Sequence, residues 1–178
     1  MNILYQPEFI RGFGTYKLRA ERLMTALEQA LNVGYRAIDT AQMYENEQEI
    51  GQVLRHHPVA RSELCITTKV LPANYSAERF MASVAQSLAA LNVEQVDVLL
   101  LHSPPKQDFS ATLRLLEQAQ RQGLTKYIGL SNFSPQQMVR AREAIAAPLV
   151  VNQVEFHPLL DQSNLLQAAV ATQIPLSS

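Results

Sequence analysis

The chain has 178 residues, of which 47% are hydrophobic and 17% are charged, a balance that excludes disordered and fibrous proteins and suits one globular domain. Its formal net charge of −1 leaves no excess of basic residues for binding nucleic acid or an acidic membrane. No basic and apolar leader opens the chain, and no apolar run reaches the roughly 18 residues of a membrane span. We therefore expect a cytoplasmic protein.

Short apolar runs typical of strands alternate with amphipathic stretches typical of helices along the whole chain. The expected pairs, in chain order, are a strand at 13–15 with a helix whose apolar face carries Leu23, Leu27, Ala30 and Leu31; 35–40 with 45–55; 63–70 with a helix carrying Phe80, Val84, Leu88 and Leu91; 96–102 with 110–123; 126–133 with a helix from 134; 148–157 with 162–172; and a last strand that begins within 174–178.

Three helix ends carry recognisable signals. Ser76 is expected to cap the helix that follows it, and Gly123 is a normal helix stop. Ser134, Pro135 and Gln137 together form the pattern of a capping box with proline in the first helical position.

Strict alternation of strands and helices indicates a parallel sheet covered by helices, either open and doubly wound or closed into a barrel. In an open sheet, ligand groups gather at one switch point, whereas the strand ends of a barrel all face one mouth. Each apolar run here ends on polar residues: Thr15, Asp39, Lys69, His102, Ser131 with Asn132, and Gln153 with His157. The pattern therefore predicts an α/β protein with the (β/α)8 TIM barrel fold.

The spacing agrees with a barrel and predicts an incomplete one. Lys69 follows Asp39 by 30 residues and His102 follows Lys69 by 33, close to the ~31 residues per unit of an eight-unit barrel. Residues 1–178 are thus expected to form a single domain of about six βα units plus the start of the seventh strand. The last two strands and the C-terminal tail of a full barrel would be lacking.

Asp39, Tyr44, Lys69 and His102 each have a structural explanation when taken alone. Asp39 suits a helix N-cap, Tyr44 suits a packing residue with a hydrated hydroxyl, and His102 suits a hydrogen-bonded core histidine. A lysine at the end of a buried strand is harder to explain, because a barrel interior desolvates its charge. Gathered at one mouth, the four residues indicate a site that delivers a proton.

The chemistry of these groups fits carbonyl reduction. A phenol is a weak acid at neutral pH, and a nearby ammonium group strengthens it by stabilising the phenolate. Tyr44 beside Lys69 would donate the proton, Asp39 would hold Lys69, and a neutral His102 would hydrogen-bond a substrate oxygen. Such a site protonates an alkoxide, which is what a carbonyl becomes when it accepts a hydride.

Six segments, in order and at matching spacing, resemble the aldo-keto reductase family: GFGTYKL, GYRAIDTAQMYENEQEIG, ITTKV, VDVLLLHSPP, YIGLSNF and VNQVEFHP. The chain is most similar to short bacterial members that act on 2,5-diketo-D-gluconate and on small dicarbonyls such as methylglyoxal. The resemblance implies an oxidoreductase that reduces a small-molecule aldehyde or ketone with NADPH, and a protein that is monomeric when full length. The site residues that it implies are Asp39, Tyr44 as proton donor, Lys69 and His102 for catalysis; Thr15, Asp39, Ser131, Asn132 and Gln153 for NADPH; Tyr16 and Ser103 for the substrate; and none for a metal.

The chain departs from the family pattern in two places. The family usually has tryptophan and proline after the catalytic histidine, but Ser103 follows His102 and the chain has no tryptophan, which predicts a wider or more polar pocket. The family segments that stack on nicotinamide and bind the pyrophosphate and the 2′-phosphate would follow residue 178. We therefore expect residues 1–178 alone to bind NADPH weakly.

Other hypotheses stay open. A truncated chain could be catalytically inactive, and would then be either a binding module or a non-functional fragment. A metal-dependent barrel hydrolase is weakly supported, because His56 and His57 have no acidic partner at ligand spacing. Cys65 lies in an apolar run, which favours a buried small hydrophobe over a catalytic thiol. Gly12 and Gly14 are too few for a dinucleotide-binding fingerprint.

Overall fold

The computed structural model describes residues 3–178, which form a parallel sheet whose strands alternate with helices. The sheet has the order β1-β2-β3-β4-β5-β6-β7, so that each strand pairs with the next one along the chain. The elements are β1 (Gly12–Gly14), α1 (Ala20–Asn32), β2 (Ala37–Asp39), α2 (Glu47–His56), β3 (Cys65–Val70), α3 (Ala77–Leu91), β4 (Val96–Leu101), α4 (Phe109–Arg121), β5 (Thr125–Ser131), α5 (Pro135–Ala144), β6 (Leu149–Gln153), α6 (Ser163–Thr172) and β7 (Leu176–Ser177). Short 3-10 turns lie at η1 (Ile3–Tyr5), η2 (Gln42–Tyr44), η3 (Arg61–Glu63) and η4 (Pro72–Asn74).

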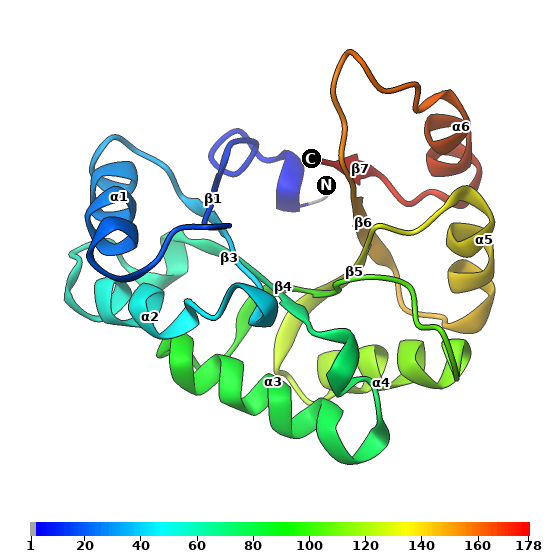
Figure 1. The fold of residues 1–178 in the computed structure, drawn as a ribbon, viewed down its shortest axis with the longest axis horizontal. Helices are drawn as coiled ribbons and strands as arrows, with labels where there is room; N and C mark the ends of the chain where they lie inside the picture. The colour runs from blue at the N-terminus through cyan, green and yellow to red at the C-terminus, as the bar shows by residue number, and fades with distance from the viewer. Residues whose placement is uncertain (1–2) are drawn as a thin grey trace.

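The sheet is curled into part of a barrel, with the helices on its outer, convex side (Figure 1). This confirms the predicted incomplete TIM barrel of six βα units and the start of a seventh strand. β1 and β7 lie at the two edges of the sheet, and the N-terminal segment lies in the gap between them (Figure 1). The Tyr5 hydroxyl donates to the carbonyl of Leu176 at 2.9 Å and so links this segment to β7.

Two apolar clusters hold the layers together. The larger one joins the outer side of the sheet to the helices and contains the predicted helix faces, including Leu23, Leu27 and Phe80. The smaller one fills the inside of the curl, where Ile3 packs with Ala37, Cys65, Val98, Leu100 and Val151. Burial raises the pKa of the Cys65 thiol to about 12. Because the thiolate is the reactive form, Cys65 has the properties of a buried small hydrophobe.

The helix ends agree with the sequence in two of three cases. Ser134 and Gln137 form the predicted capping box, and Gly123 takes a φ of +76° just after α4, where glycine is favoured. Ser76 does stand at the N-cap position of α3, but its hydroxyl makes no capping hydrogen bond. It accepts instead from Nε of Arg79 at 3.4 Å.

Strand β6 ends earlier than the sequence suggested. Its last paired residue is Gln153, which lies opposite Ser177, and after the bond from the Val154 N–H to the Ser177 carbonyl the chain leaves the sheet. His157 therefore lies in the following loop, where its ring is exposed and contacts Glu155. The expectation that His157 belongs to the strand end was wrong, and Gln153 is the polar residue there.

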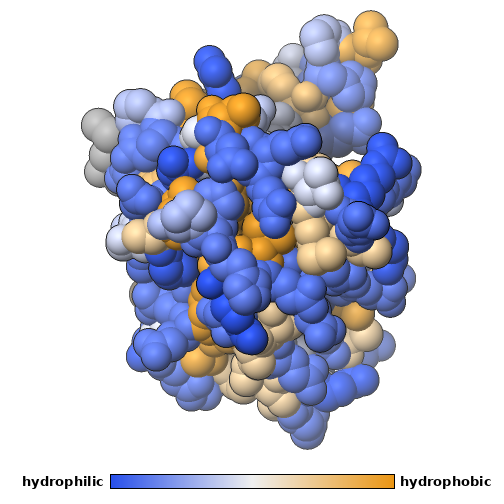
Figure 2. All heavy atoms as spheres, turned by 90° about the vertical axis from the view of Figure 1, so that its left-hand side faces the viewer, coloured by the Kyte–Doolittle hydropathy of each residue, from blue (hydrophilic) through white to orange (hydrophobic). Residues whose placement is uncertain are grey.

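The surface agrees with the ordinary composition of the chain. Figure 2 shows a face that hydrophilic residues mostly cover, with small apolar areas between them. None of the helices within residues 3–178 combines the length and the apolar character needed to cross a lipid bilayer.

Candidate active site

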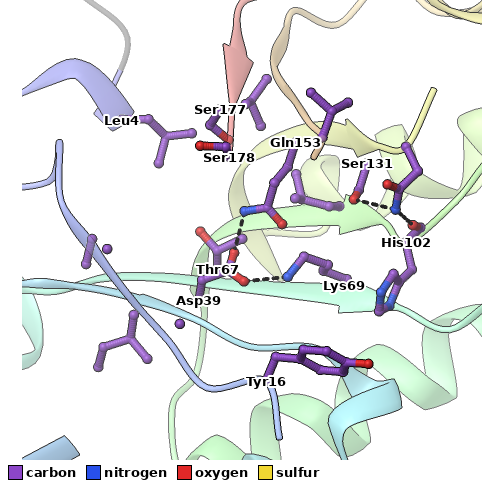
Figure 3. Close-up of a pocket in the computed structure, with 18 of the residues that line it drawn as sticks. Leu4, Tyr16, Asp39, Thr67, Lys69, His102, Ser131, Gln153, Ser177 and Ser178 are labelled. Carbon is purple, nitrogen blue, oxygen red and sulfur yellow. Dashed lines mark hydrogen bonds and ion pairs between the residues drawn. The ribbon is translucent and has the colours of Figure 1, made fainter. Parts of the chain in front are cut away.

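A cavity of about 720 Å³ opens at the C-terminal ends of the strands. Figure 3 shows side chains from β2, β3, β5 and β6, together with the residue that follows β4, turned into it. Eight residues that the sequence singled out line this cavity: Tyr16, Asp39, Tyr44, Lys69, His102, Ser131, Asn132 and Gln153. A parallel barrel brings these groups together because all its strands end on the same side.

Lys69 is the centre of the site. Its side chain is 1% exposed, and its ammonium group donates to Asp39 Oδ1 at 2.5 Å, to the Thr40 carbonyl at 3.1 Å and to the Tyr44 hydroxyl at 3.2 Å. The three acceptors match the three protons of an ammonium group. Lys69 is thus held as a buried cation in contact with the phenol oxygen.

Tyr44 is carried by the turn η2 rather than by a strand. Its ring lies 4.9 Å from the ammonium nitrogen of Lys69 and is approached edge-on by the His102 ring at 5.8 Å between centroids. Tyr16 packs on the other side at 5.1 Å between centroids. The phenol therefore stands between a cation and an imidazole at the edge of the cavity.

The surroundings of His102 favour its neutral form. Burial is the largest effect and lowers the pKa of His102. The Lys69 ammonium lowers this pKa further, whereas the Asp39 carboxylate raises it and partly offsets the other two effects. Its buried Nδ1 has no hydrogen-bond partner among residues 3–178. A neutral imidazole keeps one N–H donor and one acceptor, so His102 can offer a hydrogen bond without bringing a charge.

Three amide and hydroxyl groups line the wall beside the four candidate catalytic residues Asp39, Tyr44, Lys69 and His102, here called the tetrad. Asn132 takes a φ of +62°, and its Nδ2 donates to the His102 carbonyl at 3.0 Å and to Ser131 Oγ at 3.1 Å. Gln153 donates from Nε2 to Asp39 Oδ2 at 2.8 Å (Figure 3). Each of these side chains carries polar groups suited to a neutral amide.

The remaining predicted residues lie differently. Tyr16 is 61% exposed at the rim of the cavity. Thr15 is fully buried, and its hydroxyl donates to the Asp39 carbonyl at 3.0 Å. Ser103 holds the Tyr75 hydroxyl through its backbone. Neither Thr15 nor Ser103 is among the described residues that line the cavity, so their contacts with a ligand stay predictions.

The sequence did not point to several residues that shape the site. Asn46 is fully buried, accepts from Thr40 Oγ1 at 2.9 Å and donates to the carbonyls of Thr15 and Leu18. It ties the loop that bears Tyr16 to the end of β2. Leu4, Phe9 and Ile10 add an apolar wall from the N-terminal segment. Neither spacing nor residue type marks these positions, because their roles depend on contacts between distant segments.

The described residues contain no group of three or more histidine, cysteine, aspartate or glutamate side chains that could hold a metal ion. His57, which the weak hydrolase hypothesis used, lies beside Asn32 and the backbone of Val59.

Comparison with known proteins identifies a family whose sequence pattern covers both the sheet and the site. The model of the Aldo/keto reductase family matches residues 12–177. The chain belongs to the aldo/keto reductase family. Residues 12–177 include every strand of the sheet and all the side chains of the tetrad.

Several members of the family are similar over most of this chain. Methylglyoxal reductase DkgB of Yersinia pestis is 37% identical over 171 residues, which cover 94% of this chain and 64% of the relative. Methylglyoxal reductase DkgA of Escherichia coli K12 is 36% identical over 86% of this chain and 56% of the relative. The chain thus spans less than two thirds of the length of these curated relatives.

Solved structures show the same architecture. A protein with the provisional name 2,5-diketo-D-gluconic acid reductase B superimposes with a TM-score of 0.90 at 40% identity, over 94% of this chain and 60% of that one. The silkworm (Bombyx mori) aldo-keto reductase AKR2E5, complexed with NADPH, gives 0.87 at 34% identity, over 93% of this chain and 57% of that one.

Proposed function

We propose that the protein reduces small aldehydes and ketones, with dicarbonyls of the methylglyoxal type as the first substrate class, using NADPH. The observation that supports this proposal most strongly is that the ammonium group of Lys69 is buried and contacts both Asp39 and the Tyr44 hydroxyl. The relatives named for methylglyoxal reduction support the substrate class. The solved complex of AKR2E5 with NADPH supports the cofactor.

Tyr44 is the proton donor in this proposal. When a substrate carbonyl accepts a hydride, its oxygen becomes an alkoxide and needs a proton. The phenol can supply it, because Lys69 lies 3.2 Å from its oxygen and stabilises the negative charge that remains. Asp39 keeps Lys69 in place and compensates its charge in the buried site.

His102 orients the substrate. Its neutral ring can donate a hydrogen bond to the same carbonyl oxygen that Tyr44 protonates, since the two rings are adjacent. A neutral donor polarises the carbonyl and leaves Lys69 without a second cation beside it. Tyr16, at the exposed rim, would contact the rest of the substrate.

The residues of the cavity wall fit the nicotinamide end of NADPH. Ser131, Asn132 and Gln153 present hydroxyl and amide groups that match a carboxamide, and Asp39 can accept from a ribose hydroxyl. Thr15 would contribute by fixing Asp39, whose carbonyl its hydroxyl holds. When bound, NADPH supplies the hydride.

The test is the substitution Tyr44→Phe, which removes only the hydroxyl. We expect methylglyoxal reduction to fall about 10²–10⁴-fold, the range of a positioned acid, with NADPH binding unchanged in a fluorescence titration. Tyr35→Phe is the matched control, since Tyr35 precedes β2 at the opposite end of the barrel. Near-normal turnover in Tyr44→Phe would contradict the assignment. Binding of NADPH without any turnover in the unmodified chain would favour the binding module instead.

A further inference from the structure

We propose that the loop 71–75, between β3 and α3, positions Tyr44 and His102 relative to Lys69 through Gln42 and Tyr75. The proposal rests on the proposed function for its kinetic consequence, but its structural content is independent of it. Lys69 needs no such help, because it belongs to β3 and pairs with Leu100 in the ladder between β3 and β4. Tyr44 and Ser103 lie outside the strands, so other contacts must hold them.

Gln42 connects the turn of Tyr44 to this loop. It is the first residue of η2, the turn that ends at Tyr44. Its Oε1 accepts from the Leu71 N–H at 2.8 Å and from Asn74 Nδ2 at 3.0 Å. Its Nε2 donates to the Ser83 carbonyl and to Ser87 Oγ, each at 3.1 Å.

These four bonds use the full hydrogen-bonding capacity of a glutamine amide. An amide with every group satisfied has one favoured orientation. The Tyr44 turn is therefore tied to the loop that follows Lys69, and also to α3 on the outer side of the sheet.

Tyr75 connects the other side of the loop to His102. Its hydroxyl donates to the Ser103 carbonyl at 2.8 Å and accepts from the Ser103 N–H at 3.2 Å. Ser103 directly follows His102, whose own N–H donates to the Val70 carbonyl at 3.2 Å. Burial raises the pKa of Tyr75 to about 12, so its hydroxyl stays protonated and keeps both bonds at any working pH.

The loop 71–75 is thus hydrogen-bonded to the turn that carries Tyr44 and to the segment that carries His102. Lys69 lies two residues before Leu71, the Tyr44 turn is joined at Leu71 and Asn74, and the His102 segment is joined at Tyr75. A displacement of about 1 Å in a reacting group can lower a rate by a hundredfold. Gln42 and Tyr75 are positioning residues in this arrangement, since they act through Tyr44 and His102.

The first test is Tyr75→Phe, which removes both bonds to Ser103 and keeps the ring against Phe80, 6.5 Å away between centroids. The readout is the titration of His102 by proton NMR, assigned among the four histidines by loss of its signal in His102→Asn. Asp39 of β2, Lys69 of β3 and Tyr44 of η2 face its ring, and Tyr75 adjoins its backbone. A loosened segment admits water, so we expect the pKa of His102 to rise toward its ordinary value. Tyr35→Phe should leave it unchanged.

The second test is Gln42→Met, which keeps the length of the side chain and removes its hydrogen-bonding groups. We expect the nuclear Overhauser contact between the Tyr44 and His102 rings, 5.8 Å apart between centroids, to weaken. Gln120→Met is the control, because Gln120 makes its bond to the Lys126 carbonyl near the start of β5, at the other end of the barrel. Urea unfolding of each variant establishes that it is folded at the temperature of measurement.

Turnover of methylglyoxal gives the kinetic readout. In both variants we expect kcat to fall about 10- to 100-fold, with KM for NADPH changed less than twofold. An unchanged His102 titration in Tyr75→Phe would show that Tyr75 does not position His102. An unchanged ring contact in Gln42→Met would show that Gln42 does not position Tyr44. Unchanged kcat in both variants overturns the positioning role. If the unmodified chain binds NADPH but shows no turnover, the proposed function fails, and the NMR measurements alone decide the role of the loop.

Discussion

At the scale of single residues, the buried ammonium of Lys69 defines the site. A charge with 1% exposure is tolerated only with close partners, and Lys69 has a carboxylate, a carbonyl and a phenol oxygen around it. In the proposed function, the same contacts that make this burial possible would also prepare the phenol for proton transfer. Stability and chemistry are therefore linked through one side chain.

Asp39→Asn tests this link. The substitution leaves the Lys69 charge buried without its counter-ion, so we expect the free energy of unfolding to fall by about 3 kcal/mol. Glu45→Gln is the matched control, because it makes the same chemical change in an ion pair at the surface. The side chain of Glu45 is 73% exposed and that of its partner Arg19 is 60% exposed. That change should stay within about 0.5 kcal/mol. Urea unfolding measures both, and equal effects would show that the Asp39 pair acts like a surface pair.

His102 gives the fold a dependence on pH. Burial and the Lys69 ammonium lower its pKa below the ordinary 6.5, so the folded protein binds the proton more weakly than the unfolded chain. The stability that neutral His102 contributes to the fold is fully present above pH 6.5. It is lost as the pH falls from 6.5 toward the lowered pKa of His102 in the folded protein. We expect thermal unfolding between pH 7.5 and 5 to show this loss in the unmodified chain.

His102→Asn should show a smaller loss over the same range. Burial raises the pKa of Glu47 above 4.5, which favours the folded state at low pH and acts in the opposite direction. Both chains contain Glu47, so the difference between them reports His102. Parallel pH curves for the two chains would contradict the prediction.

The sequence showed the tetrad because each member ends a strand or lies in the turn just after one. Asp39, Lys69 and His102 stand where an apolar run stops, and residue type alone suggests their chemistry. Gln42 and Tyr75 carry no such mark. Their partners include the backbone of Leu71 and Ser103, and a backbone contact between distant segments leaves no pattern in the residues that make it.

At the scale of secondary-structure elements, two serines at helix starts behave differently. The Ser134 hydroxyl accepts from the Gln137 N–H, and Gln137 Oε1 accepts from the Ser134 N–H. Ser76 precedes Ala77-Glu78-Arg79 and contacts the arginine side chain instead. The residue three positions after the cap decides whether the second bond of the box can form: a glutamine can accept from the N-cap N–H, whereas an arginine has no acceptor for it.

Alanine substitution should separate the two serines. We expect Ser134→Ala to lower the free energy of unfolding by about 1 kcal/mol, the usual effect of losing a cap. Ser76→Ala should have less than half of that effect, since no capping bond is lost. Urea unfolding of the two variants provides the comparison, and a larger effect at Ser76 would contradict it.

At the scale of the whole molecule, the sequence predicted the number and direction of the strands but not the place of the N-terminal segment. The alternation of apolar and amphipathic runs determines the former. Nothing in residues 3–10 shows that Ile3 packs inside the curl against Cys65 and Val98. That position depends on contacts with residues of several strands, which only the assembled sheet brings together.

Ile3→Ala tests this packing. The lost methyl groups should lower the free energy of unfolding by about 2 kcal/mol and open the inner cluster around Cys65. We expect the single thiol to react faster with a disulfide reagent such as DTNB at pH 8. Ile50→Ala serves as the control, because Ile50 belongs to the outer cluster. If Ile50→Ala accelerates the reaction as much at equal stability, general unfolding explains the exposure and the packing of Ile3 does not.

The hydrogen bond from Gln153 to Asp39 has a consequence for how ligands are selected. Both oxygens of Asp39 already accept, one from Lys69 and one from Gln153. A ligand donor that takes the place of Gln153 at Oδ2 exchanges one hydrogen bond for another, and the net gain from such an exchange is small. A ligand that displaces Gln153 without offering a matching donor loses that hydrogen bond, at a net cost of about 0.5–1.5 kcal/mol. This corner of the mouth therefore rejects mismatched ligands more strongly than it retains matched ones.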